Sequence, residues 1–302
     1  MDYTRTLDRL VTETINPDLS GLDTLPTVSI LQIMNAEDDN VAPAVALEIP
    51  NISRAVRKIV CSFRNQGRLI YVGAGTSGRL GVLDASECPP TFGSPPQLIQ
   101  AIIAGGDTAL RRSIEGAEDD VEAGAIAIAE HDVNDNDTVV GISASGRTPY
   151  VCGALAKARQ RGASTVAVVN NRPSEMEKIA AITIAPIVGP EVLAGSTRLK
   201  AGTAQKMVLN MLTTCAMIET GKTYGNLMVD VRATNVKLVA RAKRIVRQVT
   251  GAMPDVIEKA LDEAGGNAKV AIVMVSRNIT ASAAEERLTA CGGFLRKALG
   301  VG

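Results

Sequence analysis

The chain has 302 residues, of which 46% are hydrophobic and 21% charged, a composition that fits a globular protein and excludes a largely disordered one. Lys and Arg together number 32, as do Asp and Glu, so no net charge favours nucleic acid or an anionic membrane as a partner. No apolar run reaches membrane-spanning length and the N-terminus lacks the pattern of a signal peptide. These features predict a cytoplasmic protein without a nucleic-acid or membrane partner.

Cysteine and histidine usage limits the chemistry that the chain can perform. The five cysteines are dispersed without a C-x-x-C pair, which predicts reduced thiols in a cytosol rather than a disulfide framework. His131 is the only histidine, and its polar surroundings predict an exposed residue that caps the end of a helix. We therefore expect carboxylates or lysines, and not a histidine-based zinc site or catalytic triad, to carry any proton transfer.

In chain order, residues 1 to about 25 are polar and without a clear period, as expected of an arm that lies over a partner subunit. Residues 26–66 have a helical pattern that Pro50-Asn51 interrupts, with Asn51 as the predicted cap of the next helix. After Gly67, short apolar runs alternate with helical segments, which predicts a parallel sheet covered by helices on both faces. The predicted strands are residues 69–73, 99–104, 138–142, 164–169 and 181–185.

The helices predicted between and after these strands cover residues 79–86, 118–130, a segment from Pro149, and Lys200–Lys222. Beyond Gly225 the chain is more charged, and the last fifty residues suggest a small bundle of short helices. The apolar run 269–275 fits either a strand or a helix.

Two loops rich in glycine and hydroxyl groups follow predicted strands and open predicted helices. The first, residues 73–79, contains Gly75, Thr76 and Ser77, and its glycines would let backbone amides approach an anion closely. Its spacing resembles G-x-G-x-x-G, but no ribose-binding acid is evident after a second strand, and no G-K-[ST] motif is present. A tight structural turn remains the alternative for this loop taken alone.

The second loop, residues 142–149, contains Ser143, Ser145, Gly146 and Thr148. Because open α/β sheets bind ligands at the carboxyl ends of their strands, two such loops favour an anion-binding site. A third polar stretch, residues 195–200, contains Ser196 and Lys200. It could add a hydroxyl and a cation to this site, or could simply cap the helix that follows.

Two groups of carboxylates are candidates for proton transfer. Glu87 lies directly before Cys88-Pro89-Pro90, so we expect a restrained, non-helical backbone near the first loop. In the second group, Glu115, Glu118 and Asp119 would share one face of a helix if the segment is helical. A surface loop for the first group, and acids that complement a helix dipole for the second, are the alternatives.

Several motifs resemble those of the N-acetylmuramic acid 6-phosphate etherases, from about Thr27 to the C-terminus. They are Ala85-Ser86-Glu87-Cys88-Pro89-Pro90-Thr91, Glu115-Gly116-Ala117-Glu118-Asp119, Ala144-Ser145-Gly146-Arg147-Thr148-Pro149-Tyr150, Lys200-Ala201-Gly202-Thr203-Ala204-Gln205-Lys206 and Gly225-Asn226-Leu227-Met228-Val229-Asp230-Val231.

The resemblance implies an α/β fold of the sugar isomerase (SIS) type, with three layers in which helices flank a five-stranded parallel sheet, plus a small C-terminal helical domain. It divides the chain into an N-terminal arm (1–26), an SIS phosphosugar-binding catalytic domain (27–240) and a small helical domain (241–302). It also favours a helix for residues 269–275. Members of the family are homodimers without metal or other cofactor.

By similarity, Glu87 is the proton donor of the family and Glu118 its second catalytic acid. The phosphate ligands implied by other SIS domains are Thr76, Ser77, Ser143, Ser145 and Thr148, and the remaining substrate-site residues are Gly75, Gly146, Ser196 and Lys200. The implied reaction turns N-acetylmuramic acid 6-phosphate and water into N-acetylglucosamine 6-phosphate and D-lactate. Two other readings use the same loops: a sugar-phosphate isomerase, and a non-catalytic phosphosugar sensor.

Overall fold

The computed structural model describes residues 10–231 and 236–301. These residues form two compact units. The first contains the described residues up to Ala85 together with Gln97–Thr213, and the second contains Ser86–Pro96 together with the described residues from Thr214 onwards. Helices α5 (Gly75–Phe92) and α9 (Lys200–Glu219) each begin in the first unit and end in the second.

The chain reaches the sheet through short 3-10 turns, η1 (Val11–Glu13), η2 (Pro17–Leu19) and η3 (Leu22–Thr24), followed by three helices. These are α2 (Thr27–Asp38), α3 (Val41–Leu47) and α4 (Ile49–Arg64). The prediction that Asn51 caps the last of them is wrong. Helix α4 begins at Ile49, three residues earlier than predicted, and Pro50 occupies its first turn, where its missing amide hydrogen costs nothing. Inside the helix, Asn51 donates to the Glu48 carboxylate at 2.8 Å.

All five strands of the sheet are parallel, in the order β2-β1-β3-β4-β5, which confirms the predicted sheet. Each strand lies within about a residue of its predicted position. Strand β1 lies between β2 and β3: Leu69 pairs with Ile99 of β2 and Thr138 of β3, and Gly73 pairs with Ile103 and Ile142. The bounds are β1 (Leu69–Gly73), β2 (Ile99–Ile103), β3 (Thr138–Ser143), β4 (Ser164–Val169) and β5 (Ile182–Ile184).

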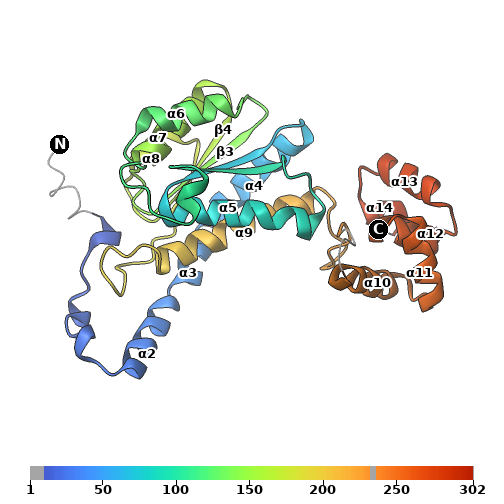
Figure 1. Cartoon of the computed structure of the whole chain (residues 1–302), viewed down its shortest axis with the longest axis horizontal. Helices are drawn as coiled ribbons and strands as arrows, with labels where there is room; N and C mark the ends of the chain where they lie inside the picture. The colour runs from blue at the N-terminus through green and yellow to red at the C-terminus, as the bar shows by residue number, and fades with distance from the viewer. Residues whose placement is uncertain (1–9, 232–235, 302) are drawn as a thin grey trace. The chain divides into compact units, whose positions relative to one another are not determined.

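Helices cover both faces of this sheet (Figure 1). On one face, α6 (Val121–Glu130), α7 (Pro149–Gln160) and α8 (Glu175–Ile179) enclose an apolar core with side chains of β1, β3 and β4. On the other face lie α4, α5 and α9. A Cβ atom at Gly81 of α5 would stand 3.0 Å from Tyr71 of β1, so this helix packs almost directly on the sheet.

Two acidic segments have a backbone that differs from the prediction. Glu87 is helical, because α5 continues to Phe92 and includes both Pro89 and Pro90 in its last turn. Residues 115–119 form a turn and not a helix. Helix α6 starts only at Val121, because the Asp120 side chain caps it by accepting from the Ala123 amide at 2.8 Å.

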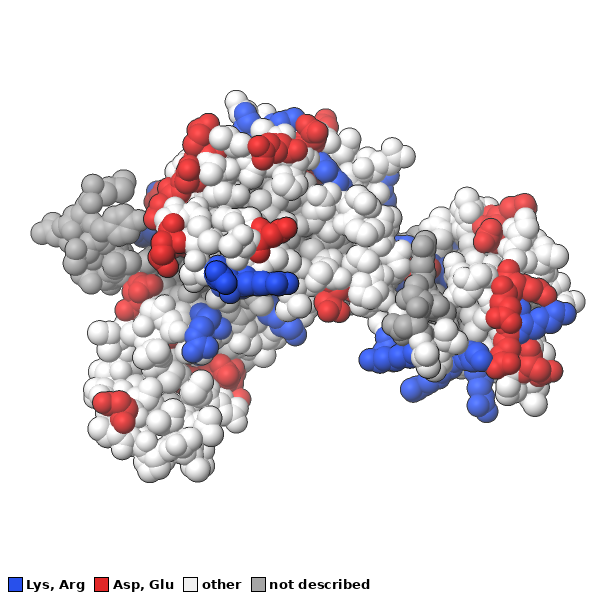
Figure 2. Space-filling view, viewed as in Figure 1, with Lys and Arg blue, Asp and Glu red and all other residues white. Residues whose placement is uncertain are grey.

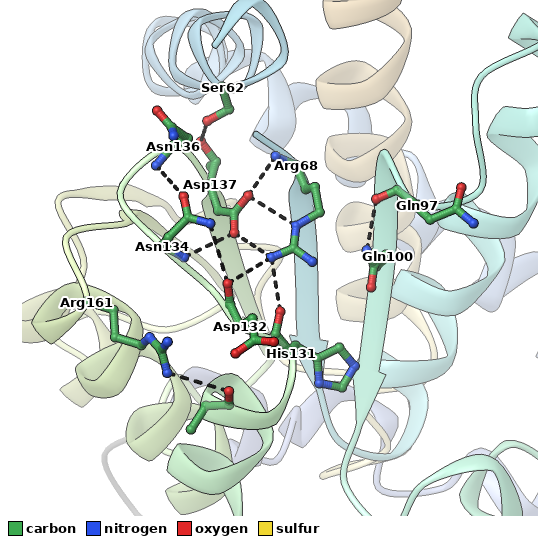
Figure 3. Close-up of polar contacts among 12 residues, drawn as sticks. Ser62, Arg68, Gln97, Gln100, His131, Asp132, Asn134, Asn136, Asp137 and Arg161 are labelled. Atoms are coloured by element: carbon green, nitrogen blue, oxygen red, sulfur yellow. Dashed lines mark hydrogen bonds and ion pairs between the residues drawn. The ribbon is translucent and has the colours of Figure 1, made fainter. Parts of the chain in front are cut away.

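Polar side chains cluster where the strands begin, at the amino edge of the sheet (Figure 3). The Asp137 carboxylate, 1% exposed, accepts two hydrogen bonds from the Arg68 guanidinium at 2.8 and 3.2 Å and a third from the Arg68 amide at 2.8 Å. Arg68 also donates to the carbonyl oxygens of His131 and Asp132. His131 caps the C-terminus of α6 as predicted but is half-buried, and Nδ1 lies 2.8 Å from the Ala127 carbonyl oxygen. The only histidine is thus part of a structural cluster.

The second unit contains five helices among its described residues, in addition to the ends of α5 and α9. Its apolar core includes the buried inner faces of these helices together with Val229 and Val231. The ambiguous run 269–275 is helical, as the resemblance implied. Basic side chains gather over α10 on the face shown in Figure 2. The helices are α10 (Val236–Thr250), α11 (Pro254–Glu263), α12 (Ala268–Arg277), α13 (Ala281–Ala290) and α14 (Leu295–Leu299).

Among the described residues, no helix combines the length and apolar character that crossing a membrane requires.

Helices α6 and α7 approach so closely that the contact tolerates only glycine. A Cβ atom at Gly153 would overlap the carbonyl oxygen of Val121, and one at Gly124 would overlap that of Tyr150. We predict that Gly153→Ala lowers the free energy of unfolding by about 1–3 kcal/mol, measured by urea denaturation, because the helices must separate. Gly202→Ala in α9 is the matched control, since its new methyl group would meet neighbours only at 3.5 Å or more. Equal stability of the two variants would contradict the prediction.

Candidate functional site

The two predicted anion-binding loops lie next to each other at the carboxyl edge of the sheet, because they follow the neighbouring strands β1 and β3. The first loop is shorter than predicted, since α5 already begins at Gly75, which has φ +52°. Thr76 and Ser77 therefore stand in the first turn of a helix. A Cβ atom at Gly73 would lie 2.7 Å from the Gly78 amide nitrogen, so the end of β1 and this turn can touch only through glycines.

The second loop is organised around the hydroxyl of Ser143, which is 3% exposed. Its Oγ lies 2.7 Å from Thr148 Oγ1 and 3.3 Å from Ser145 Oγ, and it accepts a hydrogen bond from the Gly146 amide at 3.1 Å. Gly146 has φ +67°, and a Cβ atom there would lie 2.5 Å from Cβ of Ser174. Ser145 and Thr148 are partly exposed. The loop thus presents two accessible hydroxyls on a fixed backbone.

A buried chain of amide side chains supports the first loop. Ser77 Oγ donates to Gln205 Oε1 at 2.9 Å, and Gln205 Nε2 donates to Asn170 Oδ1 at 3.0 Å. Asn170 follows β4, and its amide group donates to the Pro186 carbonyl oxygen at 2.9 Å. Sequence reasoning missed the positioning roles of Gln205 and Asn170. Only the position of Asn170 directly after a buried strand could have indicated one.

The start of α9 lies beside the first loop, since a Cβ atom at Gly202 would be 3.7 Å from Thr76 Cγ2. Lys200 there is 2% exposed and its ammonium group forms an ion pair with Glu37 of α2. The Glu191 carboxylate, 1% exposed, caps this helix by accepting from the amides of Lys200 and Ala201 at 2.9 Å each. Ser196 is partly exposed in the turn before the helix. Lys200 thus already has an acidic partner within the chain.

A cavity of about 200 Å³ opens at the same edge of the sheet and brings Gly75 and Glu118 together. The turn that carries Glu118 is held by its backbone, because the Tyr150 amide at the start of α7 donates to the Glu118 carbonyl oxygen at 3.0 Å. The Glu118 side chain itself is exposed. Glu118 therefore stands on a fixed turn that shares its cavity with the start of the first loop and is hydrogen-bonded to the helix that the second loop opens. The lining residues are Ala74, Gly75, Arg79, Ala104, Ala109, Arg112, Ser113, Ile114, Glu115, Gly116, Ala117 and Glu118.

Glu87 lies on α5, the helix that Gly75 begins, about three turns further along. Its side chain is exposed and is not among those that line the cavity. In the described parts of the chain, no group of three or more His, Cys, Asp or Glu side chains is placed to hold a metal ion.

Asp84, one turn before Glu87, anchors α5 to the sheet and to α9. Its buried carboxylate accepts from Tyr71 Oη of β1 at 2.8 Å, and from Asn210 Nδ2 and Thr213 Oγ1 of α9 at 2.7 and 3.3 Å. Burial raises the pKa of the Asp84 carboxyl, and these hydrogen bonds offset part of that rise. No local pattern in the sequence indicates this role of Asp84, because its partners lie 13, 126 and 129 residues away.

A parallel sheet with helices on both faces and hydroxyl-rich loops at its carboxyl edge places the chain in the class of SIS-domain proteins. Residues 51–159 match the family model of the glucokinase regulatory protein N-terminal SIS domain, and residues 120–215 match that of the SIS domain. Among solved structures, a phosphoheptose isomerase from Francisella tularensis aligns over 65% of this chain and 99% of its own, with 17% identity and a TM-score of 0.47.

Similarity over almost the whole length identifies the family within this class. The chain is 53% identical over 293 residues to an N-acetylmuramic acid 6-phosphate etherase of Clostridium botulinum strain Loch Maree, covering 97% of each chain. It is 52% identical over 293 residues to N-acetylmuramic acid 6-phosphate etherase 2 of Vibrio parahaemolyticus, covering 97% of this chain and 98% of the relative. The chain belongs to the N-acetylmuramic acid 6-phosphate etherase family.

The raised pKa of Asp84 predicts how the stability that this residue contributes changes with pH. Because the folded state binds this proton more tightly than the unfolded state, it holds more protons between pH 3.8 and the raised pKa. The contribution of Asp84 to stability therefore falls as the pH rises through that window. We predict that the stability of the wild type relative to Asp84→Asn, measured by urea denaturation from about pH 4 to pH 7, decreases with rising pH. A difference that stays constant or grows would contradict this.

Proposed function

We propose that this chain is an enzyme that cleaves the D-lactyl ether of N-acetylmuramic acid 6-phosphate, giving N-acetylglucosamine 6-phosphate and D-lactate. Family membership over nearly the whole chain supports this reaction. The single structural observation that carries the proposal is the position of Glu118, on a fixed turn that shares a cavity with the first hydroxyl-bearing loop and is hydrogen-bonded to the helix that the second loop opens.

In this proposal the two loops bind the 6-phosphate. The hydroxyls of Thr76 and Ser77 would act from the first turn of α5, where amides and the helix dipole also favour an anion. Those of Ser145 and Thr148 would act from the second loop, with Ser143 fixing both. The Nε of Arg147 supports an anion here, since it is buried without a hydrogen-bond partner among the described residues. Gly75 and Gly146 allow the backbone to approach, and Ser196 and Lys200 complete the proposed site.

The proposed chemistry is elimination followed by addition of water. In the open-chain sugar, the lactyl ether on carbon 3 stands β to the aldehyde carbon, so the proton on carbon 2 is acidic. A base removes this proton, the bond between carbon 3 and the ether oxygen breaks, and an acid protonates the departing lactate oxygen. Water then adds its oxygen to carbon 3 of the double bond, and carbon 2 regains a proton. Each half needs one base and one acid, which two carboxylates can supply.

We assign the removal of the carbon 2 proton to Glu118 and the protonation of the lactate oxygen to Glu87. Both side chains are exposed and so accessible to a substrate. The helical backbone of Glu87 and the capped turn before α6 hold the two carboxylates on defined backbones.

The setting that we propose for this reaction is a homodimer in the cytoplasm. Val28, Leu31 and Leu47 of α2 and α3 are 65%, 59% and 81% exposed, which supports burial against a second copy. A phosphorylated sugar as substrate and five dispersed cysteines support a cytoplasmic location. Residues 1–26 would be an arm, 27–240 the catalytic domain and 241–302 the small helical domain.

Release of D-lactate from N-acetylmuramic acid 6-phosphate tests the reaction directly. We expect the purified chain to produce D-lactate and N-acetylglucosamine 6-phosphate in equal amounts. A sugar-phosphate isomerase would interconvert sugars without lactate, and a non-catalytic sensor would bind the sugar unchanged. Either of these results would reject the proposed activity.

Isotope exchange tests the roles of the two glutamates. We predict that Glu118→Gln loses solvent-deuterium exchange at carbon 2, whereas Glu87→Gln keeps the exchange but releases lactate about 100- to 10,000-fold more slowly. Glu115→Gln is the matched control, because it removes the same charge from the same cavity and should retain both activities. Loss of exchange in Glu87→Gln with retention in Glu118→Gln would reverse the assignment.

A further inference from the structure

Two arginines line the cavity that contains Glu118. Arg79 comes from the second turn of α5 and Arg112 from the segment after η4 (Asp107–Leu110), and both share the cavity of about 200 Å³ with Gly75. Neither arginine is among the residues that the proposed function assigns to the phosphate, although Arg79 is the last residue of the first loop. Among the described residues, neither forms an ion pair with an acidic side chain.

The backbone around these arginines is fixed. Arg79 donates through Nε to the Leu110 carbonyl oxygen at 3.2 Å, which ties the guanidinium to the segment that carries Arg112. The Arg112 amide donates to the Thr108 carbonyl oxygen at 3.1 Å. Gly105, with φ +85°, lets this segment fold tightly, since a Cβ atom there would lie 3.0 Å from Cβ of Ile114. The two arginines therefore stand on segments that are tied to each other, and both line the same cavity.

The charges of the cavity suit a substrate that brings a second anion. The lining contains two guanidinium groups, of Arg79 and Arg112, besides the carboxylates of Glu115 and Glu118. The proposed substrate carries a phosphate on carbon 6 and a carboxylate on the lactyl group, which is joined to carbon 3. If the hydroxyl loops hold the phosphate, the carboxylate must enter near the group that acts on carbon 2, and Glu118 lines the same cavity as the arginines.

We infer that Arg79 and Arg112 form the subsite for the lactyl carboxylate, and so determine specificity for the muramic acid ether over hexosamine 6-phosphates that lack it. This inference rests on the proposed function. A guanidinium group matches a carboxylate with two parallel N–H donors, which gives both strength and orientation. Binding the carboxylate here would hold the ether oxygen and carbon 3 beside the proposed base.

Binding of substrate and product separates this subsite from the phosphate site, because only the substrate carries the carboxylate. The affinities of N-acetylmuramic acid 6-phosphate and N-acetylglucosamine 6-phosphate are measured by calorimetry in a Glu87→Gln background, chosen to slow turnover. We expect Arg112→Gln in that background to weaken substrate binding at least about tenfold and to leave product binding within about twofold. Arg112→Lys, which keeps the charge, should recover part of the lost affinity.

Arg111→Gln is the matched control, since Arg111 is exposed and next in sequence but does not line the cavity. It should leave both affinities unchanged. If Arg112→Gln weakened the binding of substrate and product equally, the arginine would hold the phosphate. If the affinity for the substrate were unchanged, the arginine would hold neither group. Each result overturns the inference. Failure of the proposed function is separate: the wild type would then release no lactate, whatever Arg112→Gln does to binding.

Discussion

The contact between the end of β1 and the first turn of α5 is the constraint on which the candidate site depends. Gly73 and Gly78 allow the strand and the helix to touch, so the hydroxyls of Thr76 and Ser77 emerge directly at the sheet edge. The hydrogen bonds from Ser77 to Gln205 and from Gln205 to Asn170 then join three segments that are distant in sequence. Because these groups are buried and paired, the loop keeps one conformation before any ligand arrives.

A second constraint, at Asp84, connects this edge to the rest of α5. The carboxylate is shared among Tyr71, Asn210 and Thr213, so the helix cannot rotate without leaving a buried charge unpaired. Glu87 follows one turn later on the same helix. Together, the glycine contact and Asp84 fix α5 at both ends of its first three turns.

The parts of the fold that could be predicted from the sequence are those that local pattern encodes. Apolar runs flanked by glycine and polar residues placed all five strands, because buried parallel strands have few other compositions. The predicted bounds of two helices were wrong because single side chains determine where these helices start or end. Asp120 caps α6 and so delays its start, and α5 continues through Pro89 and Pro90. No local pattern reveals the roles of Gln205, Asn170 and Asp84, because their partners lie far along the chain. The motifs that resemble the family did indicate the loops themselves.

The cluster around Arg68 and Asp137 occupies the amino edge of the same sheet, opposite the edge that carries the loops (Figure 3). This ion pair, in which the buried Asp137 carboxylate accepts two hydrogen bonds from the partly exposed Arg68 guanidinium, secures the starts of β1 and β3 without any contribution from a ligand. The chain therefore separates what holds the sheet together from what meets the substrate. Such a division lets side chains in the cavity diverge toward new sugars during evolution while the scaffold persists.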